Sequence, residues 1–144
     1  MYWYVIMPVI AWFVAGSVKF AVNYCRFGGQ AVGLIGNGGF PSTHTTIVCS
    51  TVTLIALREG LNSPTTGLGV AFLMVTVFDA LGLRRAVGRQ AERINTLNGR
   101  LGSEENNLRE RQGHTPVEVL GGAVLGGALA GAAFLLNSGV GGTP

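Results

Sequence analysis

Charged side chains are scarce in this chain. Of its 144 residues, 12% are charged and 48% are hydrophobic, whereas soluble domains carry about 25% charged residues. The mean hydropathy is +0.43. This composition argues against an ordinary soluble domain and predicts an integral membrane protein, with a soluble helical bundle as the alternative.

Cysteine and histidine are also rare, with two residues of each. Cys25 and Cys49 lack metal or redox spacing, so we expect ordinary packing thiols. Two histidines and scattered acidic residues likewise lack the spacing of a zinc centre, and we expect no metal and no cofactor. The N-terminus lacks the basic region and cleavage site of a signal peptide, so residues 1–4 are predicted to form an aromatic interface anchor.

Four long apolar stretches carry the hydrophobic excess. They cover residues 2–18, 43–57, 63–83 and 115–140. A spanning helix needs about 20 mainly apolar residues, so the first, third and fourth are long enough. The second is short and would span only if the loop before it dips below the membrane surface. We therefore predict an all-α membrane bundle of about four transmembrane helices, a single domain over residues 1–144. Residues 27–40, which hold six glycines, would form a loop that can be re-entrant.

Basic residues are distributed unevenly between these stretches. Lys19 and Arg26 lie between the first and second, and Arg58 between the second and third. Seven arginines lie between the third and fourth: Arg84, Arg85, Arg89, Arg93, Arg100, Arg109 and Arg111. The positive-inside rule then places the rich side in the cytoplasm and both termini outside the inner membrane. Orientation, anionic lipids or a phosphate ligand account for the basic excess without a nucleic-acid partner.

The second stretch begins in an unusual way. Gly36, Gly38 and Gly39 lead to Pro41, then to Ser42, Thr43 and His44. Helix N-termini expose unpaired N–H groups and carry a partial positive charge, so this start is a candidate anion site. The alternative is an ordinary helix start, in which Ser42 is the N-cap and His44 a passive polar residue.

The third stretch contains one acidic residue, Asp79, near its inner end. Acidic side chains inside membranes are rare and usually paired. Asp79 would therefore position an arginine or a ligand, or form a salt bridge that holds the helix end. Apolar residues spaced by three and four continue from Val87 to Leu101 and predict that the helix extends into the cytoplasm. We expect residues 84–113 to form this amphipathic extension and its loop.

The fourth stretch opens with a complete helix-start signal. Thr115 is a good N-cap, Pro116 suits the first helical position, and Glu118 is a capping-box glutamate. This signal leaves His114 unexplained. Further on, small residues allow close approach of another helix, within the monomer or in a homo-oligomer. These residues are Gly122, Gly126, Gly127 and Gly131.

Alternating topology brings both histidines to the same membrane face. Lys19, Arg26 and Asp79 fall there too, although Lys19 can instead be an interfacial lysine whose amine reaches the head groups. Such a group suits a phosphoryl site. One histidine can attack phosphorus while the other protonates the leaving oxygen, and cations stabilise the negative charge. A carboxylate can fix the nucleophile's tautomer, and Glu118, four residues from His114, is the candidate.

These residues resemble a known family. Residues 41–44, Pro-Ser-Thr-His, are similar to the Pro-Ser-Gly-His motif of the type 2 phosphatidic acid phosphatase superfamily, which is related to vanadium haloperoxidases. Lys19 with Arg26 resembles its first motif, with Phe27 in place of a proline. His114 with Glu118 resembles its third motif, with glutamate for aspartate. Residues 38–44, 79–91 and 113–119 look more like the divergent branch of small bacterial and plastid membrane proteins.

The resemblance implies metal-independent hydrolysis of a lipid phosphomonoester at the cytoplasmic face. His114 would be the nucleophile, Glu118 its orienting residue and His44 the general acid. The resemblance and the charge pattern together give the substrate-binding candidates: Lys19, Arg26, Ser42, Thr43, Asp79, Arg84, Arg85 and Arg89. Leu108 stands where the third motif has its arginine, which leaves Arg84, Arg85, Arg89 and Arg109 as replacements.

Two further functions are consistent with the sequence. One is a membrane protein without catalytic activity that binds phospholipid head groups or assembles through its glycine-rich fourth helix. The other is a transporter. This function is less favoured, because four short helices offer little room for a substrate pathway and the sequence shows no inverted repeat.

Overall fold

Every regular element in the described part of the chain is a helix. The computed structural model describes residues 2–29, 39–102 and 107–140, with the side chains of 139 and 140 excepted. Its helices are α1 (Trp3–Phe27), α2 (Thr43–Glu59), α3 (Pro64–Phe78), the π-helical turn η2 (Asp79–Leu83), α4 (Arg84–Leu101) and α5 (Pro116–Val140). The predicted all-α membrane bundle is confirmed. The expected re-entrant loop falls largely on residues 30–38, outside the described residues.

Three helices are long and apolar enough to cross a membrane. They are Trp3–Phe27, the continuous helix Pro64–Leu101 and Pro116–Ser138. α2 has 17 residues, and at 1.5 Å per residue it is about 26 Å long, shorter than a hydrocarbon core of about 30 Å. The expectation that the second stretch alone falls short of a full span is therefore confirmed for the described helices.

The helix boundaries follow local capping signals. Ser63 caps α3 by accepting the N–H of Thr66 at 3.1 Å, with Pro64 in the first helical turn. Gly60 follows α2 and Gly102 follows α4 at φ values of 90° and 67°. Glycine reaches such values without steric cost, so both positions suit the end of a helix.

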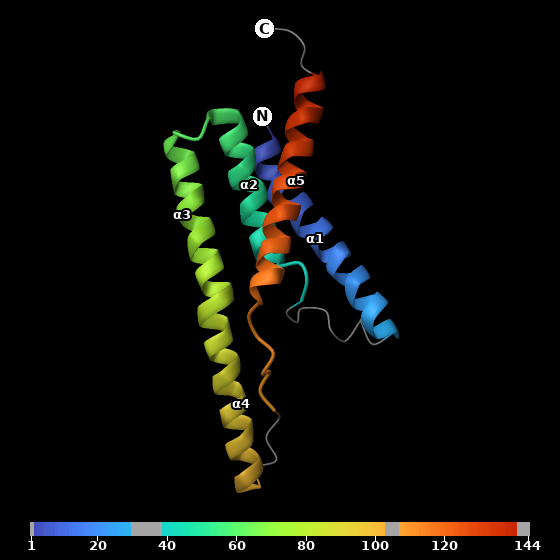
Figure 1. The fold of residues 1–144 in the computed structure, drawn as a ribbon, viewed down its shortest axis with the longest axis vertical. Helices are drawn as coiled ribbons and strands as arrows, with labels where there is room; N and C mark the ends of the chain where they lie inside the picture. The colour runs from blue at the N-terminus through green and yellow to red at the C-terminus, as the bar shows by residue number, and fades with distance from the viewer. Residues whose placement is uncertain (1, 30–38, 103–106, 141–144) are drawn as a thin grey trace.

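α2 is the central helix of the bundle and packs against α5, α1 and α3 (Figure 1). The core cluster lies where three of these helices meet, with Met7 from α1, Leu54 from α2, and Ala130 and Ala133 from α5. Many large apolar side chains point outward instead; Phe13, for example, is 69% exposed. This pattern fits helices whose outer faces contact lipid rather than water.

α2 and α5 approach closely because glycines line their contact. A Cβ atom at Gly122 would lie 2.6 Å from the Ser42 carbonyl oxygen, and one at Gly126 would lie 2.7 Å from that of Thr46. These two glycines therefore serve packing within the monomer. A Cβ at Gly127 or Gly131 would meet nothing within 4 Å.

The long helix contains a turn that periodicity did not predict. Asp79–Leu83 is π-helical, and the Arg84 N–H donates to the carbonyl of Asp79, five residues back. In a regular α-helix, side chains five residues apart point about 140° from each other. The wider π turn brings the side chains of Asp79 and Arg84 together in an ion pair.

The two ends of the bundle differ in their charge. Figure 1 shows the first turns of α1, the last turns of α5 and the α2–α3 connection at one end. There the Arg58 guanidinium carbon lies 5.4 Å from the centre of the Tyr4 ring. The first turn of α2, the first turn of α5 and the whole of α4 lie toward the other end, which the sequence makes rich in arginine.

Candidate active site

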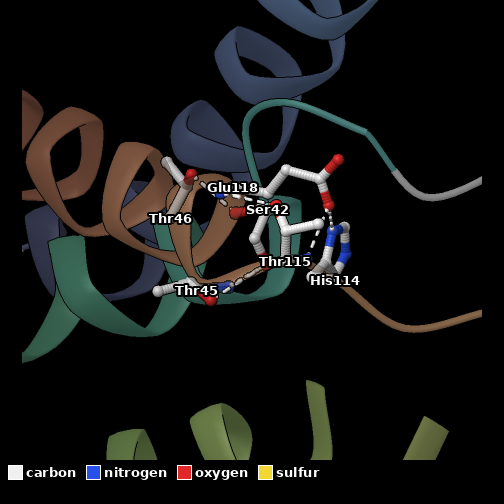
Figure 2. A network of polar contacts seen from close by, with 6 residues as sticks. All are labelled: Ser42, Thr45, Thr46, His114, Thr115 and Glu118. Atoms are coloured by element: carbon white, nitrogen blue, oxygen red, sulfur yellow. Dashed lines mark hydrogen bonds and ion pairs between the residues drawn. The ribbon is translucent and has the colours of Figure 1, made fainter. Parts of the chain in front are cut away.

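His114 and Glu118 form the centre of the candidate site (Figure 2). His114 Nδ1 lies 3.0 Å from Glu118 Oε2, and the Thr115 N–H donates to the same oxygen at 3.0 Å. The Glu118 N–H in turn donates to Thr115 Oγ1 at 3.3 Å, which completes the capping box. The capping box at the start of α5 thus also orients the ring of His114, which precedes it.

The His114 ring is buried and its backbone is anchored. The residue is 9% exposed, and its N–H donates to the Ala80 carbonyl at 3.0 Å. In a regular α-helix that carbonyl would accept the N–H of Arg84, which the π turn gives to Asp79 instead. The π turn therefore presents a backbone acceptor to the residue that carries the imidazole.

The surroundings of His114 lower its pKa. Burial is the main cause, because an apolar environment disfavours the charged ring. The hydrogen bond to Glu118 raises the pKa and opposes this effect, whereas the positive charges of Lys19 and Arg84 lower it further. The net result favours the neutral imidazole, which is the form able to act as a nucleophile.

The start of α2 is tied directly to the start of α5. The Ser42 N–H donates to the Glu118 carbonyl at 2.8 Å. Ser42 is fully buried, and its hydroxyl accepts hydrogen bonds from the N–H of Thr45 at 3.5 Å and from its hydroxyl at 2.9 Å. Ser42 is thus the N-cap of α2, and its contacts in Figure 2 hold the two helix starts together.

Both histidines line one cavity of about 260 Å³. His44, which is exposed in the first turn of α2, is one of the residues that line it. The rest of the lining comes from α3, η2, α4 and the residue before α5: Phe72, Val75, Thr76, Asp79, Ala80, Arg84 and His114. Phe72 and Val75 are 61% and 63% exposed, so one wall is apolar and continues onto the outer surface of α3.

Asp79 and Arg84 supply the charged part of this lining. Arg84 Nε donates to Asp79 Oδ2 in an ion pair that leaves both side chains partly exposed. The charge of Arg84 acts on both histidines. Asp79 was expected either to position an arginine or to form a salt bridge at the helix end. Its ion pair with Arg84 fits both expectations.

The remaining candidates lie at different distances from the cavity. Lys19 is half-buried on α1, and its charge acts on both histidines. Arg26, in the last turn of α1, is exposed, and that end of α1 diverges from the other helices in Figure 1. Arg85 and Arg89 are exposed on α4, and neither lines the cavity. Thr43, the first residue of α2, is half-buried.

Two features of the site had no clear signal in the sequence. One is the π turn, which depends on a bond pattern rather than on residue type. The other is the apolar wall of Phe72 and Val75, which periodicity treats as ordinary lipid-facing surface.

Chemically, the arrangement combines an oriented neutral imidazole, a second imidazole and cations around a small cavity. Within residues 2–29, 39–102 and 107–140, no group of three or more histidine, cysteine, aspartate or glutamate side chains could hold a metal ion. The donor set is that of a site for an anion and for proton transfer.

Comparison with known proteins gives the family. Residues 3–129 match the Divergent PAP2 family. The chain belongs to this family. The match covers all the helices that contribute to the cavity, and it confirms the resemblance carried by the three motifs.

A curated relative of this Divergent PAP2 protein is also a membrane protein. The chain is similar to the uncharacterized membrane protein YuiD of Bacillus subtilis (strain 168). The two are 34% identical over 104 residues, which is 62% of this chain and 66% of the relative. The matched part is therefore just under two thirds of the relative's length. No solved structure matches the chain.

Proposed function

We propose that the protein hydrolyses a phosphomonoester on a membrane lipid through a phosphohistidine intermediate. The observation that carries the proposal is the cavity that His44 and His114 both line, in which the His114 ring is held by Glu118. Family membership supports a phosphatase-related chemistry. The reaction requires no metal ion, because imidazole and cationic side chains supply the nucleophile, the acid and the charge stabilisation.

His114 is the proposed nucleophile, acting through Nε2. Donation of the Nδ1 hydrogen to the Glu118 carboxylate leaves the lone pair of a neutral ring on Nε2. Nε2 attacks phosphorus, so an N–P bond forms as the ester P–O bond breaks. The resulting positive charge on the ring is stabilised by Glu118, as the acid of a catalytic triad does.

His44 is the proposed general acid and then the general base. Protonated His44 gives its proton to the lipid oxygen that leaves, and the neutral ring then takes a proton from water. That water attacks the phosphohistidine, which releases inorganic phosphate and restores neutral His114. The exposure of His44 in the first turn of α2 leaves its ring accessible to both the leaving group and water.

Arg84 and Lys19 are the proposed phosphate-binding cations. Arg84 lines the cavity, and Asp79 holds its guanidinium. Arg84 therefore takes the role of the arginine that Leu108 replaces in the third motif. The N–H groups of Thr43 and His44 at the start of α2 lack carbonyl partners within the helix and add donors for phosphate oxygens.

The apolar wall favours a lipid as the carrier of the phosphate. Phe72 and Val75 connect the cavity to the outer, lipid-facing surface of α3. A diacyl or prenyl chain would lie along this wall while its head group enters the cavity. The uneven arginine distribution supports a site that faces the cytoplasm, with both termini outside the inner membrane.

The leaving group offers a sharp test of these roles. In detergent with a chelator present, the wild-type protein is expected to release phosphate from lipid monophosphates. His114→Ala should abolish release from every substrate. His44→Ala should slow release from lipid phosphates, whose alkoxide leaves poorly, but should spare p-nitrophenyl phosphate, whose leaving group needs little protonation. Unchanged rates of phosphate release from lipid monophosphates in both variants would exclude the mechanism.

Self-association is a second candidate function, favoured by one observation. Gly127 and Gly131, four residues apart on α5, have open space at their Cβ positions, while Gly122 and Gly126 pack on α2. A stripe of this kind can admit the helix of a second copy. Cross-linking of a cysteine introduced beside Gly131 would report such a dimer, and its absence at all protein-to-detergent ratios would exclude it.

A further inference from the structure

The segment before His114 runs along one face of α4. Figure 1 shows this segment beside the long helix, and its contacts come at three levels. At the first level, Leu108 is hydrogen-bonded to Asn95. At the second, Glu110 and Gln112 lie against Gly88. At the third, the His114 N–H is hydrogen-bonded to the Ala80 carbonyl. Because these α4 and η2 positions are spaced by about two helical turns, they share one face of the helix.

Asn95 uses its whole side-chain amide at the far end of the segment. Its Oδ1 accepts the N–H of Leu108 at 2.8 Å, and its Nδ2 donates to the carbonyl of Leu108 at 2.8 Å. The same nitrogen donates to Glu110 Oε1 at 2.8 Å. A single side chain thereby pairs with both backbone groups of one residue, as a neighbouring strand would.

Glycines allow close contact at the other two levels. A Cβ atom at Gly88 would lie 2.4 Å from the carbonyl oxygen of Glu110. One at Gly113, where φ is 78°, would lie 2.9 Å from the carbonyl oxygen of Ala80 and 2.6 Å from Arg85 Cγ. At these two levels the backbone of the segment therefore lies close against the helix.

The segment is short and is also held by its own hydrogen bonds: the Gln112 N–H donates to the Glu110 carbonyl, and Gln112 Nε2 donates to the Arg109 carbonyl, both at 2.9 Å. Six residue steps from Leu108 to His114 span at most about 20–22 Å in an extended chain. A chain fixed at both ends of such a span transmits a change at one anchor to the other.

We propose that Asn95 is a positioning residue for His114, acting through the short segment 108–114, which is anchored at both ends. Asn95 fixes the far end of the segment, Gly88 and Gly113 hold it on the helix, and His114 is thereby held against Ala80 and Glu118. The proposal rests on the proposed function, since it assigns a role in placing the nucleophile. It also makes the cytoplasmic helix α4 part of the catalytic apparatus rather than a passive extension.

Substitution of Asn95 tests the proposal. Asn95→Ala is expected to lower kcat for lipid phosphate by about 10- to 100-fold, because a shift of about 1 Å at a reacting group can cost that much. KM should change little, since Arg84 and Lys19 are untouched. Trypsin should cleave faster after Arg109 and Arg111. Asn98→Ala, on the same helix, is the matched control and should behave like the wild type.

Two further variants separate positioning from general damage. Asn95→Asp keeps the size of the side chain but removes the donors and repels Glu110, so kcat should fall. Adding Glu110→Gln to it restores a donor toward the new carboxylate and should recover part of the lost kcat. Insertion of one glycine between Arg109 and Glu110 leaves the Asn95 contacts with Leu108 but lengthens the chain between the two anchors by up to about 3.4 Å, and it too should lower kcat.

The outcomes distinguish this proposal from the proposed function. If the wild type is active, and trypsin cleaves Asn95→Ala faster although its kcat is unchanged, the positioning role is excluded. If the wild type hydrolyses no phosphomonoester, the proposed function fails, and the NMR titration of His114 decides the proposal. A pKa that moves toward its ordinary value in Asn95→Ala, because the ring is less buried, supports it; an unchanged pKa overturns it.

Discussion

One carboxylate oxygen of Glu118 serves both the start of α5 and the ring of His114. Oε2 lies 3.0 Å from His114 Nδ1 and accepts the N–H of Thr115 at 3.0 Å. The capping bond fixes where the carboxylate lies, so the ring it contacts is oriented by the helix itself. Helix capping and orientation of the proposed nucleophile are therefore one structural feature.

Glu118→Gln is expected to retain the cap but lose the chemistry. The amide oxygen can still accept both the Thr115 N–H and the Nδ1 hydrogen, but the neutral amide cannot stabilise the positive charge that the ring gains on attack. Loss of this stabilisation should lower kcat by about 10²-fold or more. Steady-state hydrolysis of a lipid phosphate measures this, with Glu59→Gln, exposed at the other end of the bundle, as the control.

The pH dependence of the reaction should reflect the environment of His114. Burial lowers its pKa, so the neutral nucleophile persists below the ordinary histidine value of about 6.5. The acidic limb of kcat/KM should therefore have its midpoint below that value, with activity lost as the pH falls through it. Because Glu118 raises this pKa, Glu118→Gln should move the His114 titration, followed by NMR, to still lower pH. A shift to higher pH would contradict the assignment.

Arg84 should contribute mainly to phosphate binding. A hydrogen bond to a charged group contributes about 1.5–3 kcal/mol, so Arg84→Ala should weaken binding of vanadate or inorganic phosphate by about 10- to 100-fold. Isothermal titration in detergent measures the change. Arg100→Ala, in the last turn of α4, removes the same charge outside the cavity and should leave affinity unchanged. Equal losses in both variants would reduce the role of Arg84 to bulk electrostatics.

Two neighbouring glycines on α5 should respond oppositely to alanine. The Cβ of Gly126→Ala would lie 2.7 Å from the Thr46 carbonyl oxygen and 2.9 Å from the Ser50 nitrogen, while that of Gly127→Ala meets nothing within 4 Å. Overpacking should cost the first about 1–3 kcal/mol of stability. The second should gain up to about 1 kcal/mol from helix propensity. Thermal unfolding in detergent compares them, and equal stabilities would contradict the close packing of α2 on α5.

Much of the fold follows from patterns that the sequence displays directly. Hydropathy located the apolar helices, and the Thr115 and Glu118 capping box located the start of α5 within one residue. Periodicity from Val87 to Leu101 predicted α4, which ends at Leu101 before Gly102. These features depend on local residue types, so a single sequence is enough to identify them.

The remaining parts of the site depend on contacts between distant segments. Periodicity assumes 3.6 residues per turn, and the π turn at Asp79–Leu83 breaks that assumption. The pairing of Asp79 with Arg84 and the anchor of His114 on Ala80 both follow from this turn. Likewise, Asn95 looks like an ordinary exposed helix residue until Leu108 is placed beside it.

The central claim is that His114 carries the phosphoryl group, and trapping that group tests it most directly. The protein is mixed with a ³²P-labelled lipid monophosphate, quenched in alkali during turnover and digested for mass spectrometry. If His114 is the nucleophile, acid-labile, alkali-stable phosphate will be found on its Nε2 and will be absent from His114→Ala. Phosphate on His44, or none on any residue while hydrolysis proceeds, would contradict it.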